Sequence, residues 1–514
     1  MKPNLNLHLL AGLSLFSLSL PADASAAPRL PALFGDHMAI QADRPTPCWG
    51  WSQPGAGIDI VFKDDTSSRT IDTHASADAS GRWQTTLPAL PSGSRGTLRF
   101  TDPSGQTIVR DVIAAEVWLA SGQSNMTRQI GTPDFPAQVA QTARTEAAGT
   151  GGGIRFFSVP QEGADEPTDD VHGKWIVVTP ESVAKCSAVA WNFALSLHDE
   201  LKSPVGMIVS AYGGTPVESW LPREALDSTP EAASVWKRND ERLAPYLQEM
   251  KAYDKALETW KQHGQPAGSM PAKPNPAPLR EAPVRLYNQM IHGLIPYAAQ
   301  GIIWYQGEQN SGRPAEYPDL IRALVTSWRK LWGAELPFYY VELANVHAPQ
   351  TKPSEGGWAL IREAQSAVLT LPGTGVATAI DVSDGTIHPW NKKPVGQRLA
   401  ALALHDVYGR PGDPRSPCYA SCDIAGDKVR LSFLHATGLR VRGGGDLRGF
   451  AIRGGDGAWH WAQSRIVGDR IEVWSPDVPA PAAVRYGWAS NPVLSIENQN
   501  GLPLLPFRTD PESP

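Results

Sequence analysis

Short segments in which apolar and polar residues alternate dominate residues 27–112. In the stretch GIDIVF, Ile58, Ile60 and Phe62 occupy every second position, which is the pattern of a half-buried strand. Glycine and proline pairs such as Pro54-Gly55 separate these segments at turn-like intervals. The pattern predicts an N-terminal β-sandwich-like domain over residues 27–112.

Longer apolar runs replace this alternation over residues 113–414. The runs VGMIVSA (205–211) and GIIWY (301–305) are almost wholly apolar, as strands covered on both faces are. Between such runs, apolar residues recur every three or four positions, and this helical spacing is typical of core packing. One such set is Leu320, Leu324, Trp328 and Leu331. The order predicts an α/β domain with helices on both faces of a parallel sheet.

Two further segments complete the organisation of the chain. Residues 221–285 are polar and helix-prone and end in a proline-rich stretch, which predicts a helical hairpin and a surface loop inserted in the α/β domain. The insertion either roofs the active site or is a solvated excursion without a role. Strand patterns return in KVRLSFLH and RIEVWS and predict a C-terminal β-rich module over residues 415–514.

The first 26 residues have the pattern of a secretory signal peptide. Lys2 precedes an apolar stretch from Leu7 to Leu20, and Ala24-Ser25-Ala26 supplies a small-x-small cleavage site. The apolar stretch is too short to span a bilayer comfortably. We expect cleavage after Ala26 and a secreted or periplasmic protein with no membrane association after cleavage.

Composition and charge narrow the functional classes. The net charge is -6 and no Lys/Arg-rich run is present, which argues against a nucleic-acid partner. Four cysteines in 514 residues do not form a disulfide framework, and no Cys/His spacing suggests structural zinc. Cys418 and Cys422 can pair only if the backbone folds back between them. The sequence leaves the oligomeric state open.

Candidate chemistry lies just past the predicted strands of the α/β domain. Ser124 sits in a small polar turn, SGQSNM, directly after an apolar run. Gly213 and Gly214 follow the next run and allow a backbone to approach a ligand closely. An exposed serine needs a neighbouring base and N–H donors for an oxyanion before it acts as a nucleophile.

The two remaining patches supply polar partners for such a serine. Gln306 and Glu308 in WYQGEQN offer an amide and a carboxylate, although Glu308 also suits an ordinary helix start. His388 follows Asp381 and Asp384 in DVSDGTIHPW, where an acid can hold the imidazole in one tautomer. An early serine, a late histidine, and glycines and an amide between them fit acyl transfer to water.

Several long motifs, in the same order, resemble the sialate O-acetylesterase group of SGNH-type hydrolases. They are EVWLASGQSNM, GGTPVESW, LYNQMIHGLIPYAAQGIIWYQGEQN and IHPWNKKPVGQRLA, and the resemblance extends over nearly the whole mature chain. It implies a flavodoxin-like α/β/α esterase core of three layers over residues 113–414, flanked by β-sandwich-like modules. It also implies removal of acetyl groups from sugars without a metal or organic cofactor.

The resemblance assigns roles to individual residues. Ser124 matches the family nucleophile and His388 its general base. Gly214 N–H, the Gln306 side chain and Ser124's own N–H correspond to the oxyanion hole. The acid departs from the family pattern, because Gly385 stands where an aspartate three residues before the histidine is usual.

The sequence leaves three alternatives for this acid. Asp384 is slightly favoured and reaches His388 if the loop bends. Glu308 is the competitor, because related acetylesterases with a Gln-Gly-Glu block use that glutamate. In the third alternative a Ser–His dyad performs most of the chemistry.

The expected partner is an O-acetylated sugar or polysaccharide. Indole rings pack well on sugars, although most tryptophans of a protein belong to its core. The substrate-binding candidates are Trp220, Trp304, Asn310, Trp390 and Arg128. Arg128 and Arg313 could each bind the carboxylate of a sialic acid, but both equally suit surface ion pairs. Acetylated plant polysaccharides such as acetyl-xylan or xyloglucan are the alternative substrates. A non-catalytic carbohydrate-binding protein and a peptidase are the alternative classes.

Overall fold

The computed structural model describes residues 27–265, 268, 270–353 and 356–510. The expected signal peptide lies outside these residues. Within them, no helix is long and apolar enough to cross a membrane. No group of three or more His, Cys, Asp or Glu side chains in this part of the chain has a metal-binding arrangement.

The N-terminal strands lie on either side of short turns, as their alternating pattern predicts. The first six are β1 (Ala39–Gln41), β2 (Thr46–Trp51), β3 (Gly57–Asp64), β4 (Thr70–Ser76), β5 (Arg82–Leu87) and β6 (Arg95–Asp102). Strand β3 pairs antiparallel with β4 and β6, and β2 pairs with β5. Ile58, Ile60 and Phe62 of β3 are fully buried.

Strand β7 (Gly105–Gly122) joins the N-terminal domain to the α/β domain without a break. Its first half pairs antiparallel with β6, and its second half is parallel to β10 and β11. Burial changes accordingly, from intermittent before residue 112 to nearly continuous after it. The expected boundary at residues 112/113 therefore falls inside one strand.

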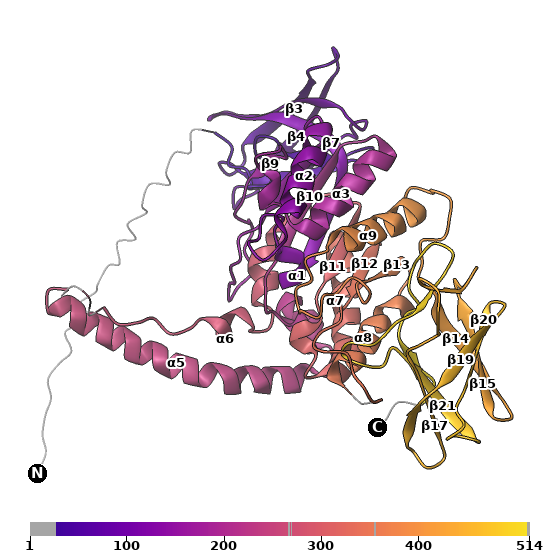
Figure 1. Ribbon diagram of the computed structural model, residues 1–514. Helices are drawn as coiled ribbons and strands as arrows, with labels where there is room; N and C mark the ends of the chain where they lie inside the picture. The colour runs from indigo at the N-terminus through magenta and orange to yellow at the C-terminus, as the bar shows by residue number, and fades with distance from the viewer. Residues whose placement is uncertain (1–26, 266–267, 269, 354–355, 511–514) are drawn as a thin grey trace, which may run out of the picture.

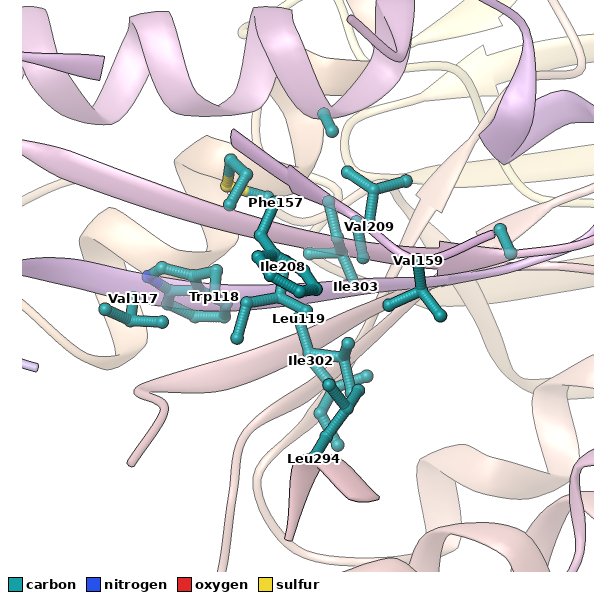
Figure 2. Packing of buried hydrophobic residues seen from close by; sticks show 14 of the residues in the cluster. Val117, Trp118, Leu119, Phe157, Val159, Ile208, Val209, Leu294, Ile302 and Ile303 are labelled. Carbon is teal, nitrogen blue, oxygen red and sulfur yellow. The ribbon is translucent and has the colours of Figure 1, made fainter. Parts of the chain in front are cut away.

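The α/β domain is built on the sheet order β13-β12-β11-β7-β10-β8-β9, in which only β9 runs antiparallel. The remaining strands of this sheet are β8 (Ile154–Ser158), β9 (Trp175–Val177), β10 (Val205–Ala211), β11 (Gly301–Tyr305), β12 (Phe338–Glu342) and β13 (Thr374–Thr378). Figure 2 shows the apolar side chains of the central strands packed together. This is the SGNH-like α/β/α architecture that the sequence predicts.

Helices cover both faces of this sheet. Trp118 of β7 packs edge-on against Phe193 of α3 (Ala188–Leu201), with ring centroids 5.0 Å apart. Trp304 of β11 meets Trp328 of α7 (Tyr317–Trp332) at 6.0 Å. Because Trp304 pairs in register with Ser121, three residues beyond Trp118, the two tryptophans point to opposite faces. Helix α9 (Lys393–Asp406) packs beside α3, and α8 (Gly357–Gln365) beside α7.

The inserted segment forms one long helix rather than the expected hairpin of two. Helix α5 (Ala232–Gln262) projects from the body of the molecule (Figure 1), and only Val235, Asn239 and Tyr246 of its described residues are buried. The chain returns mostly without regular structure, apart from the short α6 (Ala277–Arg280). Proline spacing explains the difference, because prolines between residues 271 and 278 interrupt helical hydrogen bonding.

The C-terminal module has its own apolar core and two four-stranded antiparallel sheets. One sheet has the order β14-β15-β20-β19 and the other β18-β17-β21-β23; β16 pairs with β22. The strands are β14 (Cys418–Ala425), β15 (Lys428–Leu434), β16 (Arg440–Val441), β17 (Phe450–Gly454), β18 (Trp459–Trp461), β19 (Gln463–Val467), β20 (Arg470–Trp474), β21 (Pro481–Tyr486), β22 (Ile496–Glu497) and β23 (Phe507–Arg508). Arg508 is paired through two nitrogens with Glu363 of α8, which fastens the module to the α/β domain. The four cysteines are free thiols, and Cys418 and Cys422 share strand β14.

Candidate active site

The candidate residues gather where parallel strands end at one edge of the sheet. Ser124 opens the short helix α1 (Ser124–Thr127) immediately after β7. Gly213 and Gly214 follow β10, and Gln306 follows β11, on the two strands adjacent to β7. Since the carboxyl ends of parallel strands meet at one edge, three sequence motifs converge there.

Glycine is required in the turn that presents Ser124. Gly122 has a φ of +129°, and a Cβ on it would lie 2.2 Å from the Tyr305 carbonyl oxygen. The Gln123 N–H donates to that same carbonyl at 2.8 Å. From the other side Gly213 approaches so closely that a Cβ there would lie 3.3 Å from Ser124 Cβ. Ser124 is thus held between the ends of β11 and β10.

His388 reaches this serine from a loop 264 residues further along the chain. Its Nε2 lies 2.9 Å from Ser124 Oγ, and the ring is half-buried. The loop follows β13 and ends before α9. The structure therefore brings together the two residues that the motifs single out.

The second ring nitrogen of His388 contacts a cation rather than a carboxylate. Arg128 Nη2 lies 2.9 Å from Nδ1. Because a guanidinium only donates hydrogen bonds, Nδ1 accepts, and the ring proton of neutral His388 resides on Nε2, facing Ser124. Arg128 Nη1 also donates to both carboxylate oxygens of Asp134, each at 2.9 Å. Asp134 was not found from the sequence, because it belongs to no motif.

Burial and two cations lower the pKa of His388. Burial is the largest cause, followed by the charges of Arg128 and Lys392, and Asp134 acts weakly in the opposite direction. The imidazole is therefore neutral over a wider pH range than an exposed one, as a general base must be.

Neither acid favoured from the sequence contacts His388 in the structure. Asp384 is exposed, and its Oδ1 accepts from the N–H and the hydroxyl of Thr386 at 3.0 and 2.6 Å. The next residue, Gly385, has a φ of +85°, so the turn directs this carboxylate back to its own loop. Glu308 is buried, and its Oε1 accepts from Asn125 Nδ2 at 2.5 Å. The structure thus differs from the expectation of an acid on His388.

A buried polar network lies beneath the loop that carries His388. Asn125 Nδ2 donates to Glu308 and also to the Ile387 carbonyl at 3.0 Å, one residue before His388. The Lys392 ammonium donates to Asn125 Oδ1. Burial lowers the pKa of Lys392 to about 7 and raises that of Glu308. Sequence reasoning missed Asn125 and Lys392, although both lie inside motifs, next to or near the two residues that it chose.

Gln306 does not point a donor toward the serine. Its side chain is fully buried, and Nε2 donates to the Thr215 carbonyl at 3.2 Å and to Asn310 Oδ1 at 2.7 Å. Both amide hydrogens are therefore used within the protein. Gly214, the other expected oxyanion residue, has a φ of +69° and lies against the Arg280 guanidinium, 3.2 Å from where its Cβ would be.

Most of the expected sugar contacts are structural instead. Trp220 and Trp304 are fully buried and pack edge-to-face at 6.1 Å, because both belong to the core. Asn310 is also buried, with Nδ2 donating to Glu218 at 2.9 Å, and Arg313 pairs with the same carboxylate at 2.9 Å. Trp220, Trp304 and Asn310 brace the turns around the site and are not accessible to substrate, whereas the Arg313 side chain is 28% exposed.

Trp390 and two further arginines are also accessible. Trp390 is 39% exposed and lines a cavity of about 290 Å³ together with Lys392 and residues of α2 (Ala137–Gly149). Arg128 is partly exposed beside His388. Arg280, from the inserted segment, is partly exposed beside Gly214 and pairs with Glu281 at 3.3 Å. The insertion therefore contributes a cation to the edge of the site.

Comparisons with known proteins place the chain among carbohydrate esterases. Residues 114–405 match the family model described as carbohydrate esterase, sialic acid-specific acetylesterase. The mouse sialate O-acetylesterase is 29% identical over 403 residues, 70% of each chain, and the human one is 28% identical over 400 residues, 70% of this chain and 67% of that one. A crystal structure of a carbohydrate acetylesterase from Xanthomonas citri has 35% identity and a TM-score of 0.79, covering 94% of this chain and 99% of that one.

Proposed function

Because the chain belongs to the sialic acid-specific acetylesterase family of carbohydrate esterases, and so is a carboxylic ester hydrolase, we propose that it removes O-acetyl groups from sugars with Ser124 as nucleophile and His388 as general base. The observation that carries this proposal is the 2.9 Å separation of Ser124 Oγ and His388 Nε2. That separation is within reach for direct proton transfer.

The proposed reaction has two acyl-transfer steps. Ser124 Oγ attacks the acetyl carbonyl carbon while its proton moves to His388 Nε2. The ester C–O bond then breaks, and the sugar oxygen leaves with that proton. A water molecule, deprotonated by the same nitrogen, attacks the acetyl-serine, and acetate departs with Ser124 restored.

The protonation state of the ring sets a condition on this reaction. Nε2 accepts a proton only when it carries none, so the ring proton must first reside on Nδ1. Arg128 occupies that position as a donor, and we therefore propose that Arg128 leaves Nδ1 when substrate binds. Asp134, on the same guanidinium, is then the carboxylate that accepts a hydrogen bond from Nδ1–H and holds the ring in this tautomer.

The oxyanion hole in this proposal consists mainly of backbone donors. We propose that the N–H groups of Ser124 and Gly214 donate to the acetyl oxygen as it becomes negative, and each such donor contributes about 3–4 kcal/mol in related sites. Gln306 supports the hole by fixing Thr215 and Asn310. It would donate directly only after giving up one of these bonds.

The charges around the serine favour an acidic sugar as substrate. Arg128 and Arg280 present two partly exposed guanidinium groups that suit a carboxylate, although each has an acidic partner in the structure. An O-acetylated sialic acid carries such a carboxylate. Acetylated neutral polysaccharides are the second candidate.

The test is acetate release from O-acetylated sialosides, acetyl-xylan and acetylated xyloglucan by the full chain and by Ser124→Ala. We expect Ser124→Ala to lose about 10⁴-fold or more in kcat. Ser196→Ala is the matched control, since its hydroxyl donates to the Asn192 carbonyl within α3. Retained turnover in Ser124→Ala would remove the proposed nucleophile, and faster release from the neutral polymers would reverse the substrate order.

A further inference from the structure

A second cavity lies in the C-terminal module, between its β17–β18–β21 sheet and a loop of the α/β domain. Its volume is about 270 Å³, just below the usual size of pockets for drug-sized ligands and suited to a smaller molecule. Four aromatic side chains contribute to the lining: Phe450, Trp459, Trp461 and Trp488. Its lining shares no residue with the cavity beside Trp390.

Trp461 is the accessible indole of this cavity. It is 47% exposed, which is unusual for so large an apolar side chain. Its Nε1 donates to the Thr351 carbonyl of the α/β domain at 3.0 Å, so the ring is fixed in orientation although its surface is open. Trp459 differs, because the guanidinium groups of Arg453 and Arg485 lie over its ring at 5.2 and 4.2 Å.

Polar groups complete the lining. Arg448 and Arg485 belong to it, and no Asp or Glu does. Arg485 is bound to Asp510 by two hydrogen bonds, whereas the Arg448 side chain is 66% exposed and forms an exposed ion pair with Asp446 at 3.6 Å. An open indole face beside a guanidinium and the Asn491 amide suits a sugar ring, whose C–H face stacks and whose hydroxyls bond to nitrogen donors.

Hydrogen bonds connect the cavity lining to the loop that carries His388. Asn491 Nδ2, from the cavity lining, donates to the His347 carbonyl at 2.6 Å. The His347 N–H in turn donates to the Gly385 carbonyl at 2.9 Å, three residues before His388. These two hydrogen bonds join the cavity lining to the loop that carries His388.

We propose that this cavity binds one sugar ring of the glycan that the esterase site deacetylates, with Trp461 as the stacking platform. The identity of that glycan rests on the proposed function, whereas the binding of a sugar does not. The site distinguishes polymeric from small substrates, because an acetylated monosaccharide cannot occupy both places.

The binding test uses full-length Ser124→Ala protein, so that no turnover occurs. Unacetylated xylohexaose and 3′-sialyllactose are titrated separately, with tryptophan fluorescence and calorimetry as the readouts. We expect at least one to bind and Trp461→Ala to weaken that binding about tenfold or more. Trp474→Ala is the matched control: this partly buried tryptophan of the same module lies outside the cavity, under Lys428 and Arg465.

The kinetic test compares a polymer with a small ester in the otherwise wild-type chain. Trp461→Ala should raise KM for the acetylated polymer several-fold and leave p-nitrophenyl acetate hydrolysis unchanged. The inference is overturned if neither sugar binds at about 10 mM, which is about the weakest binding that would hold a substrate at this site. It is also overturned if the Trp461→Ala protein binds the sugars as tightly as the protein with Trp461 intact. It is also overturned if light scattering shows that Trp461→Ala dissociates a dimer, because the occupant is then a second copy of the chain.

The two proposals fail separately. Loss of sugar binding in Trp461→Ala supports the cavity whatever Ser124→Ala does to ester hydrolysis. Active Ser124→Ala protein contradicts the proposed nucleophile and leaves the binding result intact.

Discussion

Asn125→Ala removes the centre of the buried network beneath the His388 loop. Asn125 is 1% exposed and makes hydrogen bonds to Glu308, to the Lys392 ammonium and to the Ile387 carbonyl. Two of these partners are ionisable groups buried with it. The substitution leaves Glu308 and Lys392 without this shared partner in a region that water does not reach freely.

The magnitude follows from these contacts. A hydrogen bond to a charged group contributes about 1.5–3 kcal/mol, and two are lost, so we expect the free energy of unfolding to fall by about 3–6 kcal/mol. The Ile387 contact also anchors the residue before His388. Its loss loosens the 2.9 Å approach of Nε2 to Ser124, and kcat should fall about 10- to 100-fold with little change in KM.

Urea unfolding and initial rates on p-nitrophenyl acetate, measured where the variant is fully folded, test this prediction. Asn192→Ala is the control, since Asn192 Nδ2 makes one bond to the Ala188 carbonyl within α3. It should cost about 1 kcal/mol and leave kcat unchanged. The reasoning is refuted if Asn125→Ala retains wild-type kcat, or if its stability falls no more than that of Asn192→Ala.

Three further predictions concern the charges around the site. Arg128→Met removes a cation that lowers the pKa of His388. The pKa of His388 should therefore rise, and the acid limb of the pH profile of kcat/KM should move to higher pH. An unmoved limb would show that Arg128 does not act on the ring. Asp384→Asn should keep kcat/KM within about threefold, because the Asp384 carboxylate bonds to Thr386 and not to His388. Asp134→Asn should lower kcat/KM about tenfold or more. If initial rates show the reverse order, Asp384 is the acid. Burial lowers the pKa of Lys392 from 10.5 to about 7. Between these two pH values, the unfolded chain binds a proton that the folded chain does not. As pH rises through this range, the free energy of unfolding therefore increases by up to about 1.4 kcal/mol per pH unit because of this group. Lys392→Met should lack that gain in urea unfolding from pH 7 to 10, and an equal slope in both proteins would contradict the buried ammonium.

The acid of the site illustrates where sequence reasoning stopped. A carboxylate close to His388 in sequence was a reasonable expectation, and Asp384 is only four residues away. A glycine with positive φ at residue 385 and two hydrogen bonds from Thr386 hold that carboxylate within its own turn. Arg128, 260 residues away in the chain, contacts Nδ1 instead.

The tryptophans show the same limit. Sequence alone placed Trp220, Trp304 and Trp390 together, because each lies in a motif block. The first two are fully buried between β11 and its covering helix, and only the third is exposed. A motif identifies a stretch of the chain, whereas the packing around each side chain decides whether a ligand can touch it.

The amino-acid sequence by itself determined the elements and the turns of this protein. Alternating and continuous apolar patterns specify strands and helices because burial follows local periodicity, and glycine at residue 122 specifies a tight turn after β7 because no other residue fits there. Those local features were enough to single out Ser124 and His388. Only the tertiary structure decided which groups face them, since Arg128, Lys392 and Arg280 come from separate loops whose hydrogen-bond partners depend on how the loops fold against one another.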